Sequence, residues 1–353
     1  MTNRSSLNHF KTHRSLFMRI LIACFFFPCI HFDVSAQLKR FSFTQPKMGS
    51  PFTIVFYSDD SVQATTLAKK SFNLVDSFVS IFSDYIDTSE LSKLSASAGL
   101  NMPVAVSPAM LDILILSKTA FKKSGGAFDI TIGPVVKLWR QARKTKQFPS
   151  PEMVKRARSL TGFNKLVIDS INKKAILLQS GMQLDLGGIA QGYIAQKIIN
   201  FLTEQHINHA LVNASGDIVT TGAPPGTKGW TIGVNVPESK EELLSQKLLI
   251  QHKTVSTSGD AYQFMEHGGK RYSHIIDPRT GYGVTSLRNV TVIAADGTTA
   301  DWLATACSIL PIKKAKQLAT QMGGEVLVAE IKNERLVFNI TKGFSSFWKP
   351  PGR

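Results

Sequence analysis

The sequence predicts an α+β fold, in which helices and strands mix without the regular alternation of a doubly wound sheet. Three observations lead to this prediction. Two long segments, residues 61–82 and 108–124, carry apolar residues at helical spacing. The second half is richer in short runs of β-branched residues. With 353 residues, of which 43% are hydrophobic and 19% charged, the chain can bury a large core as an ordinary globular protein.

The first predicted elements are one strand and two helices. Residues 52–57 are mostly β-branched and aromatic, which predicts a strand. The helix at 61–82 presents one apolar stripe, with Leu67, Phe72 and Val75 on it. The helix at 108–124 ends at a glycine pair, a common C-terminal cap.

Further helices are predicted over residues 189–204 and about 299–310. The predicted strands of the second half cover residues 210–212, 230–236, 254–256 and 290–294.

The first 36 residues predict a secretory signal peptide. Met18 and Arg19 precede an apolar run of 13 residues, 20–32, and small residues lead to Ala36. We expect cleavage after Ala36, which leaves a single domain over residues 37–353. Two alternatives stay open. The apolar run could remain as an anchor, although it is shorter than the roughly 20 residues that span a bilayer, or Cys24 could carry a lipid.

Only one of the three cysteines, Cys307, lies in the predicted mature chain, so no internal disulfide is expected. Removing residues 1–36 takes four basic residues and one acidic residue from a net charge of +16 and leaves +13. This charge favours anionic partners in general, and attraction to anionic lipid surfaces is compatible with it. The sequence shows no recognition helix, zinc-ligand spacing or aromatic and basic platform, so nucleic-acid binding is not expected.

Residues 125–134 combine glycines with polar and aromatic groups. Gly125 and Gly126 allow the backbone to approach a ligand closely. Phe128 can stack or pack, and Asp129 can accept a hydrogen bond. A helix cap followed by a turn explains the same residues, so this segment alone leaves both interpretations open.

A second glycine pair, Gly187 and Gly188, follows Asp185 and precedes the predicted helix at 189–204. Free N–H groups and the helix dipole at such a start suit an anion. The segment is neither a P-loop nor a Rossmann fingerprint, and a tight strand–helix turn is the structural alternative. Residues 212–222 indicate a strand, a turn and a strand, which need no ligand.

His274 lies on the strand predicted just before the turn residues 277–281. Histidine is the usual acid–base group near neutral pH. A lone histidine is also often structural, so its position alone does not decide between the two roles.

Asp301 and Thr305 are four residues apart and therefore share one face of the predicted helix. A carboxylate beside a hydroxyl supplies oxygen ligands for a hard cation such as Mg²⁺. The structural alternative places Asp301 at the helix start and bonds Thr305 back to a carbonyl.

Taken together and in this order, these segments resemble the ApbE family, the FAD:protein FMN transferases. The resemblance covers nearly all of the mature chain, from about Phe41 to Leu336. The run His274-Ile275-Ile276-Asp277-Pro278-Arg279-Thr280-Gly281 and the Asp185 segment are its most specific parts. The other matching stretches are Met48-Gly49-Ser50, Ser83-Asp84-Tyr85, Ser89-Glu90-Leu91-Ser92, Ala127-Phe128-Asp129-Ile130-Thr131, Thr257-Ser258-Gly259-Asp260 and Ala300-Asp301-Trp302-Leu303-Ala304-Thr305.

The resemblance implies an ApbE-like α+β enzyme that binds FAD in a cleft, with Mg²⁺ beside the pyrophosphate. His274 would be the catalytic base, and Asp301, Thr305 and the Gly188 carbonyl would bind the metal. Gln191 departs from the family, which often has Lys or Glu there, and this weakens any argument for a charged contact. The residues implied to line the FAD site are Met48, Tyr85, Ala127, Phe128, Asp129, Asp185, Gln191 and Ile275.

The implied reaction moves FMN from FAD onto a Thr or Ser hydroxyl of a target redox flavoprotein and releases AMP. Family members are commonly exported, so we expect this protein in the periplasm or on the outer face of the inner membrane. Two rivals stay open: an FAD pyrophosphatase that uses water as the acceptor, and a non-catalytic exported flavin-binding protein. The joint presence of His274 and the Asp301–Thr305 pair disfavours the second.

Overall fold

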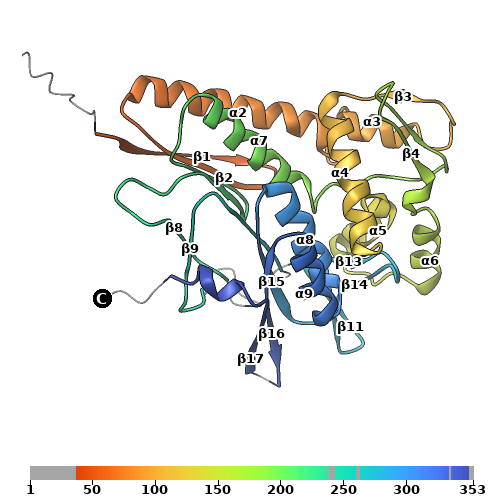
Figure 1. Cartoon of the computed structure of the whole chain (residues 1–353). Coiled ribbons are helices and arrows are strands. Elements are labelled where there is room, and N and C mark those ends of the chain that lie inside the picture. Colours follow the sequence, from red (N-terminus) through yellow and green to blue (C-terminus); the bar gives the residue numbers. More distant parts are fainter. Residues whose placement is uncertain (1–36, 236, 238–242, 260–262, 334, 350–353) are drawn as a thin grey trace, which may run out of the picture. The chain divides into compact units, whose positions relative to one another are not determined.

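An antiparallel sheet of eight strands organises the described part of the chain, in the order β1-β2-β6-β7-β10-β15-β16-β17 (Figure 1). Each neighbouring pair is antiparallel; for example, Phe52 of β2 pairs with Ala214 of β6. The predicted α+β fold is therefore confirmed. The strands are β1 (Lys39–Lys47), β2 (Ser50–Ser58), β6 (Ala210–Ala214), β7 (Asp217–Thr220), β10 (Thr254–Ser258), β15 (Arg288–Ala294), β16 (Glu325–Lys332) and β17 (Arg335–Ile340).

The predicted signal peptide, residues 1–36, lies outside the described residues. Among the residues that are described, no helix combines the length and the apolarity needed to span a bilayer. The computed structural model describes residues 37–235, 237, 243–259, 263–333 and 335–349.

Four helices pack on one face of the sheet and bury the main core against it (Figure 1). The helix α8 is enclosed by the sheet, α7 and α9, and its Ala300, Leu303 and Ala304 are fully buried. It lies so close to α7 that a Cβ on Gly192 would be 2.1 Å from the Gly297 carbonyl oxygen. The four helices are α2 (Ser61–Phe82), α7 (Ala190–Glu204), α8 (Gly297–Ile309) and α9 (Ile312–Gln321).

The other face of the sheet is covered by a pair of short antiparallel strands and a C-terminal 3₁₀ turn. Because side chains alternate along a strand, Ile54 of β2 enters the main core while Val55 joins the second cluster, where it packs with Trp230 and Phe344. The covering elements are β8 (Trp230–Ile232), β9 (Leu248–Ile250) and the 3₁₀ turn η3 (Phe344–Phe347).

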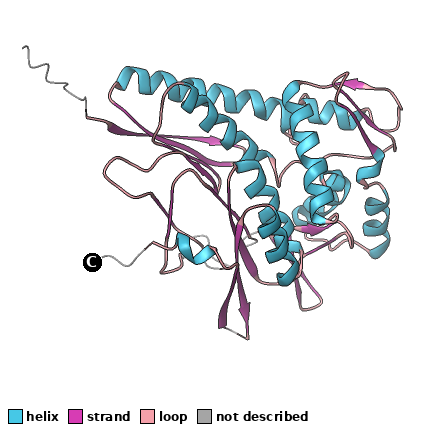
Figure 2. Cartoon of the chain, viewed as in Figure 1, coloured by secondary structure: helices cyan, strands magenta, loops and turns pink. Residues whose placement is uncertain are grey.

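The remaining helices and small sheets make up the rest of the described fold (Figure 2), and the helices at 90–96 and 108–124 contact α2. Trp139 of α5 is fully buried, and its indole nitrogen donates to the Gly281 carbonyl at 2.8 Å. This contact fixes α5 against the turn that follows His274. The elements are α3 (Glu90–Ala96), α4 (Pro108–Ser124), η1 (Ile130–Ile132), α5 (Gly133–Thr145), α6 (Pro151–Ser159), η2 (Phe163–Lys165), the sheet of β3 (Val104–Ala105), β5 (Lys174–Leu177) and β4 (Leu166–Asp169), and the pairs β11 (Phe264–His267) with β12 (Lys270–Ser273) and β13 (Ile276–Asp277) with β14 (Tyr282–Gly283).

The helices predicted at 61–82 and 108–124 are confirmed at those bounds. The strand predicted at 230–236 is wrong in length, because β8 ends at Ile232. The helix predicted from about residue 299 begins at Gly297, with Asp296 as its N-cap. Asp301 therefore does not start this helix, and the alternative that places it at the helix N-terminus is wrong.

Candidate active site

A cavity of about 470 Å³ lies where the main sheet, α7, α8, α5 and the His274 loop meet. It gathers every site residue expected from the sequence. Their roles remain predictions, but their convergence from six separate segments is a property of the fold. These residues are Met48, Tyr85, Ala127, Phe128, Asp129, Asp185, Gly188, Gln191, His274, Ile275, Asp301 and Thr305.

The glycine turn before α7 and the first turn of α7 itself lie directly against α8. The Gly192 amide donates to Asp301 Oδ2 at 2.9 Å, and a Cβ on Gly188 would lie 2.8 Å from Thr305 Oγ1. Only glycine at 188 and 192 permits this approach. The sequence prediction that Asp301 and Thr305 share a helix face is confirmed, and both line the cavity.

Asp217, at the start of β7, is a lining residue that sequence reasoning missed. It is 6% exposed, and it accepts a hydrogen bond from Ser256 Oγ on β10. Burial raises the pKa of Asp217 to about 7. Burial also raises the pKa of Asp301 well above its usual range, and the Asp217 charge raises it further. Two buried carboxyl groups thus share one end of the cavity.

This end of the cavity fits a hard divalent cation. Its donors are the two carboxylates and the Thr305 hydroxyl, which are oxygen ligands of the kind Mg²⁺ prefers. Neither carboxylate forms an ion pair with Lys or Arg among the described residues, and burial raises the pKa of both. Among the described residues, no group of three or more His, Cys, Asp or Glu side chains is placed so that it could hold a metal ion by itself. Mg²⁺ keeps waters and binds substrate phosphates, so few protein ligands suffice.

Another part of the cavity lining is built around Arg140, which sequence reasoning also missed. Its Nη2 donates to Asp185 Oδ2 at 3.0 Å, it pairs with Asp84, and its guanidinium lies 4.3 Å from the centre of the Tyr85 ring. Burial, more than any other cause, raises the pKa of Asp185. The Tyr85 side chain is 77% exposed. A flat aromatic face held by a cation at a cavity rim suits a planar ligand.

The segment around Asp129 has a structural role in addition to lining the cavity. Asp129 Oδ1 accepts from the Thr131 amide at 2.8 Å and the Thr131 hydroxyl at 2.7 Å. Phe128 is 5% exposed and packs 6.3 Å from Trp302 between ring centres, so this ring packs instead of offering a free face. The cap predicted at Gly125 is confirmed, with φ 61°.

Met48 reaches the cavity from the turn between β1 and β2. Met48 and Gly49 form a two-residue hairpin turn with φ 52° and 77°, the positive pair such turns require. Gln191 lies in the first turn of α7, and its side chain carries no charge.

His274 is half-buried and lies at a bend between β12 and β13, so its predicted place on a strand is wrong. Its backbone amide donates to the Gln263 carbonyl at 2.7 Å, and the Ile275 amide donates to Ser273 Oγ at 3.0 Å. These two bonds fix the bend, which lies in the cavity wall between β12 and β13. A histidine at such a position can accept a proton from a group bound in the cavity.

The model of the ApbE family matches residues 48–328. An FAD:protein FMN transferase of Klebsiella pneumoniae is 33% identical over 264 residues, which cover 74% of this chain and 80% of that protein. One from Treponema pallidum is 31% identical over 304 residues, covering 82% and 84%.

Solved structures agree with these relatives. The ApbE protein from Thermotoga maritima superposes with a TM-score of 0.78 at 27% identity, covering 88% of this chain and 99% of that one. The flavinyl transferase ApbE from Pseudomonas stutzeri gives a TM-score of 0.77 at 28% identity, covering 88% and 97%.

Proposed function

This chain belongs to the ApbE family and is an FAD:protein FMN transferase, and from that premise we propose how its cavity performs the transfer. FAD occupies the cavity with its pyrophosphate toward Asp301 and Thr305 and with one ring system against Tyr85. The observation that carries this proposal is the pair of buried carboxylates, Asp217 and Asp301, in a cavity that also holds His274.

Asp301, Thr305 and the Gly188 carbonyl would hold Mg²⁺, and Asp217 would add a second carboxylate. When bound, the ion neutralises the pyrophosphate and stabilises AMP as the leaving group. Phosphoryl transfer asks the protein mainly for positioning and electrostatic stabilisation.

His274 would act on the acceptor. The oxygen of a Thr or Ser hydroxyl attacks the FMN phosphorus, the bond from that phosphorus to the bridging oxygen breaks, and AMP leaves with that oxygen. The hydroxyl proton passes to the His274 imidazole. The half-buried loop position supports this role, because it leaves the imidazole at the cavity surface.

Arg140 would help to bind FAD by holding the Tyr85 ring in position. Its ion pairs with Asp84 and Asp185 hold the guanidinium beneath Tyr85, so the ring is already placed when FAD arrives. A positioned ring loses less freedom on binding, which favours affinity.

The site of action is also a proposal. The leader at 1–36 supports export, with the mature domain in the periplasm or on the outer face of the inner membrane. The target is then a redox flavoprotein exposed to that space. Mass determination of the protein recovered from cells tests cleavage after Ala36, because an N-terminus at residue 1 or 18 would contradict it.

Product analysis tests the proposed chemistry. The protein is incubated with FAD, Mg²⁺ and an acceptor domain, and AMP, free FMN and protein-bound FMN are quantified by chromatography. Transfer gives AMP and protein-bound FMN in equal amounts. Release of AMP with an equal amount of free FMN would identify water as the acceptor.

A further inference from the structure

A second cavity, of about 650 Å³, forms a groove on the side of α5 that faces α6. Residues of α5, α6 and the segment 181–183 line it, so all of its walls come from parts of the chain outside the main sheet. The lining residues are Pro134, Lys137, Leu138, Arg140, Gln141, Lys144, Met153, Arg156, Ala157, Leu160, Gly181 and Gln183.

The rim of this groove is positive. Lys137, Lys144 and Arg156 are exposed, and none forms an ion pair among the described residues. Of the lining cations only Arg140 is paired, and no Asp or Glu lines the groove. Three uncompensated cations around one concave surface attract a negatively charged partner.

The floor of the groove is apolar. Pro134 is buried, Leu138 and Ala157 are half-buried, and Met153 is 52% exposed. A free phosphate or nucleotide would use the cations but leave this floor uncovered. An acidic polypeptide segment with an apolar side chain uses both, because carboxylates meet the rim while the apolar group covers the floor.

One helix joins this groove to the active site. Val136, Arg140 and Arg143 of α5 line the FAD cavity, whereas Lys137 and Lys144 line the groove, and Arg140 borders both. A segment lying in the groove is therefore separated from the cavity only by the width of α5. A flanking loop can cross α5 and bring a hydroxyl toward His274.

We infer that this groove docks an acidic segment of the acceptor protein, and that the charges of Lys137, Lys144 and Arg156 hold it there during transfer. The inference rests on the proposed function, since it assigns the place where the macromolecular substrate binds. It predicts that acceptor recognition and FAD binding use separate surfaces of α5.

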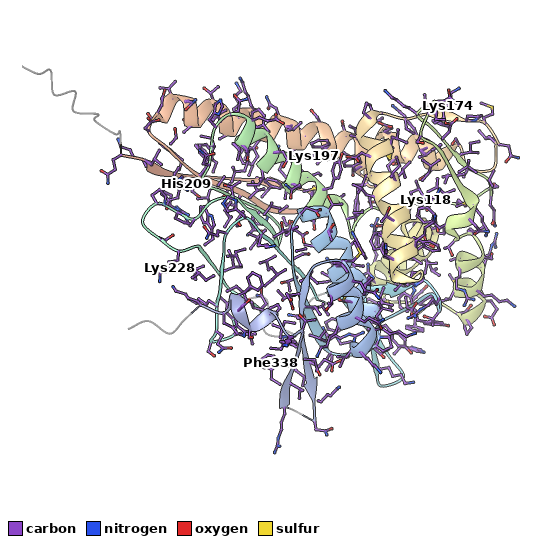
Figure 3. All side chains as sticks on the ribbon, in the orientation of Figure 1. Lys118, Lys174, Lys197, His209, Lys228 and Phe338 are labelled. Atoms are coloured by element: carbon purple, nitrogen blue, oxygen red, sulfur yellow. The ribbon has the colours of Figure 1, made fainter. Side chains whose placement is uncertain are left out.

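The test is the triple variant Lys137→Glu, Lys144→Glu and Arg156→Glu. All three side chains are exposed, so the fold is expected to persist. The matched control is Lys118→Glu, Lys174→Glu and Lys228→Glu, which makes the same charge change at exposed lysines outside the groove (Figure 3). Both variants are compared with wild type for FAD affinity, direct binding of the acceptor domain and FMN transfer.

We expect the groove variant to raise the KM for the acceptor about tenfold or more, with FAD affinity unchanged, and the control to behave as wild type. Raising salt from about 50 to about 300 mM should weaken acceptor binding to wild type far more than to the groove variant. Equal KM values for wild type and groove variant would overturn the inference. It would also be overturned if the groove variant lost binding to anionic phospholipid vesicles but still bound the acceptor domain as wild type does.

Failure of the inference is distinguishable from failure of the proposed function. If wild type does not label the acceptor, the proposed function fails, and direct binding of the acceptor domain still tests the groove. If wild type labels the acceptor and the groove variant labels it equally well, only the groove assignment fails.

Discussion

Asp217 on β7 and Asp301 on α8 face the same end of the active-site cavity, and the charge of Asp217 raises the pKa of Asp301. They belong to opposite layers of the fold, the sheet and the helix that covers it. Two buried carboxylates with no cation between them repel each other. In the proposed function the pair would link stability to metal binding and, through the metal, to the reaction.

Replacing Asp301 with Asn should separate metal binding from folding. In EDTA the variant should melt at a higher temperature than wild type, because a buried carboxylate is removed while the Asn oxygen can still accept from the Gly192 amide. Wild type should gain about 1–3 kcal/mol of unfolding free energy from saturating Mg²⁺, and the variant none. Thermal unfolding with and without Mg²⁺ measures both. Collapse of the variant would show that Asp301 is structural.

Asp217 should give the metal-free protein a characteristic pH dependence. Burial raises its pKa in the folded protein to about 7, above the usual 3.8 of an aspartate, so the folded state binds the extra proton. The stability from this group is present below the unfolded pKa and is lost as pH rises from about 4 to about 7, by roughly 2–4 kcal/mol. Denaturant unfolding in EDTA across this range measures the loss. Asp217→Asn should flatten the curve, and an unchanged slope would refute the assignment.

Replacing His274 with Ala should slow FMN transfer by about 10²–10⁴-fold, the usual contribution of a general base. FAD affinity should stay near that of wild type, since the proposed role begins after FAD has bound. Single-turnover transfer and equilibrium FAD binding separate the two effects. Wild-type transfer rates in this variant would remove His274 from the mechanism.

Tyr85 should contribute affinity without contributing stability. Its ring is 77% exposed, so Tyr85→Ala should leave the melting temperature unchanged. Loss of an aromatic contact should weaken FAD binding by about 0.5–1.5 kcal/mol, or roughly 2- to 12-fold. Fluorescence titration with FAD checks this, with Ile171→Ala, at a side chain 89% exposed, as the control. Unchanged FAD affinity would place the rings of FAD elsewhere.

Gly192→Ala should disrupt the packing of α7 on α8. The added Cβ would lie 2.1 Å from the Gly297 carbonyl oxygen and 2.7 Å from Asp301 Cβ, so both helices must move apart. We expect a loss of about 2–3 kcal/mol in unfolding free energy, together with weaker Mg²⁺ binding. The control Gly226→Ala meets no neighbour, and its φ of +76° should cost only about 1 kcal/mol.

Local signals explain which elements the sequence predicts well. The helix α4 follows Ser107, whose Oγ accepts from the Met110 amide, and ends at Gly125 in the left-handed conformation. Caps of this kind depend on a few adjacent residues, so a local sequence pattern predicts them. The strands β1 and β17 have no fully buried positions, and the apolar alternation in β1 is limited to Phe41 and Phe43, so the sequence signal for these edge strands is weak.

The same reasoning separates the predicted site residues from the missed ones. His274 and Asp301 lie in short contiguous sequence motifs, which can be recognised without a structure. Asp217 is held in the site by a hydrogen bond from Ser256, which is 39 residues away. Arg140 is held there by its bond to Asp185, which is 45 residues away. Such pairs are created by the fold, and no local pattern marks them.

The most direct test of the central claim is the intact mass of an acceptor domain after incubation with this protein, FAD and Mg²⁺. The account predicts that the acceptor gains the mass of one FMN with wild type, and that the gain disappears with EDTA or in Asp301→Asn. An acceptor that gains FMN equally well in EDTA, or with that variant, would contradict the account.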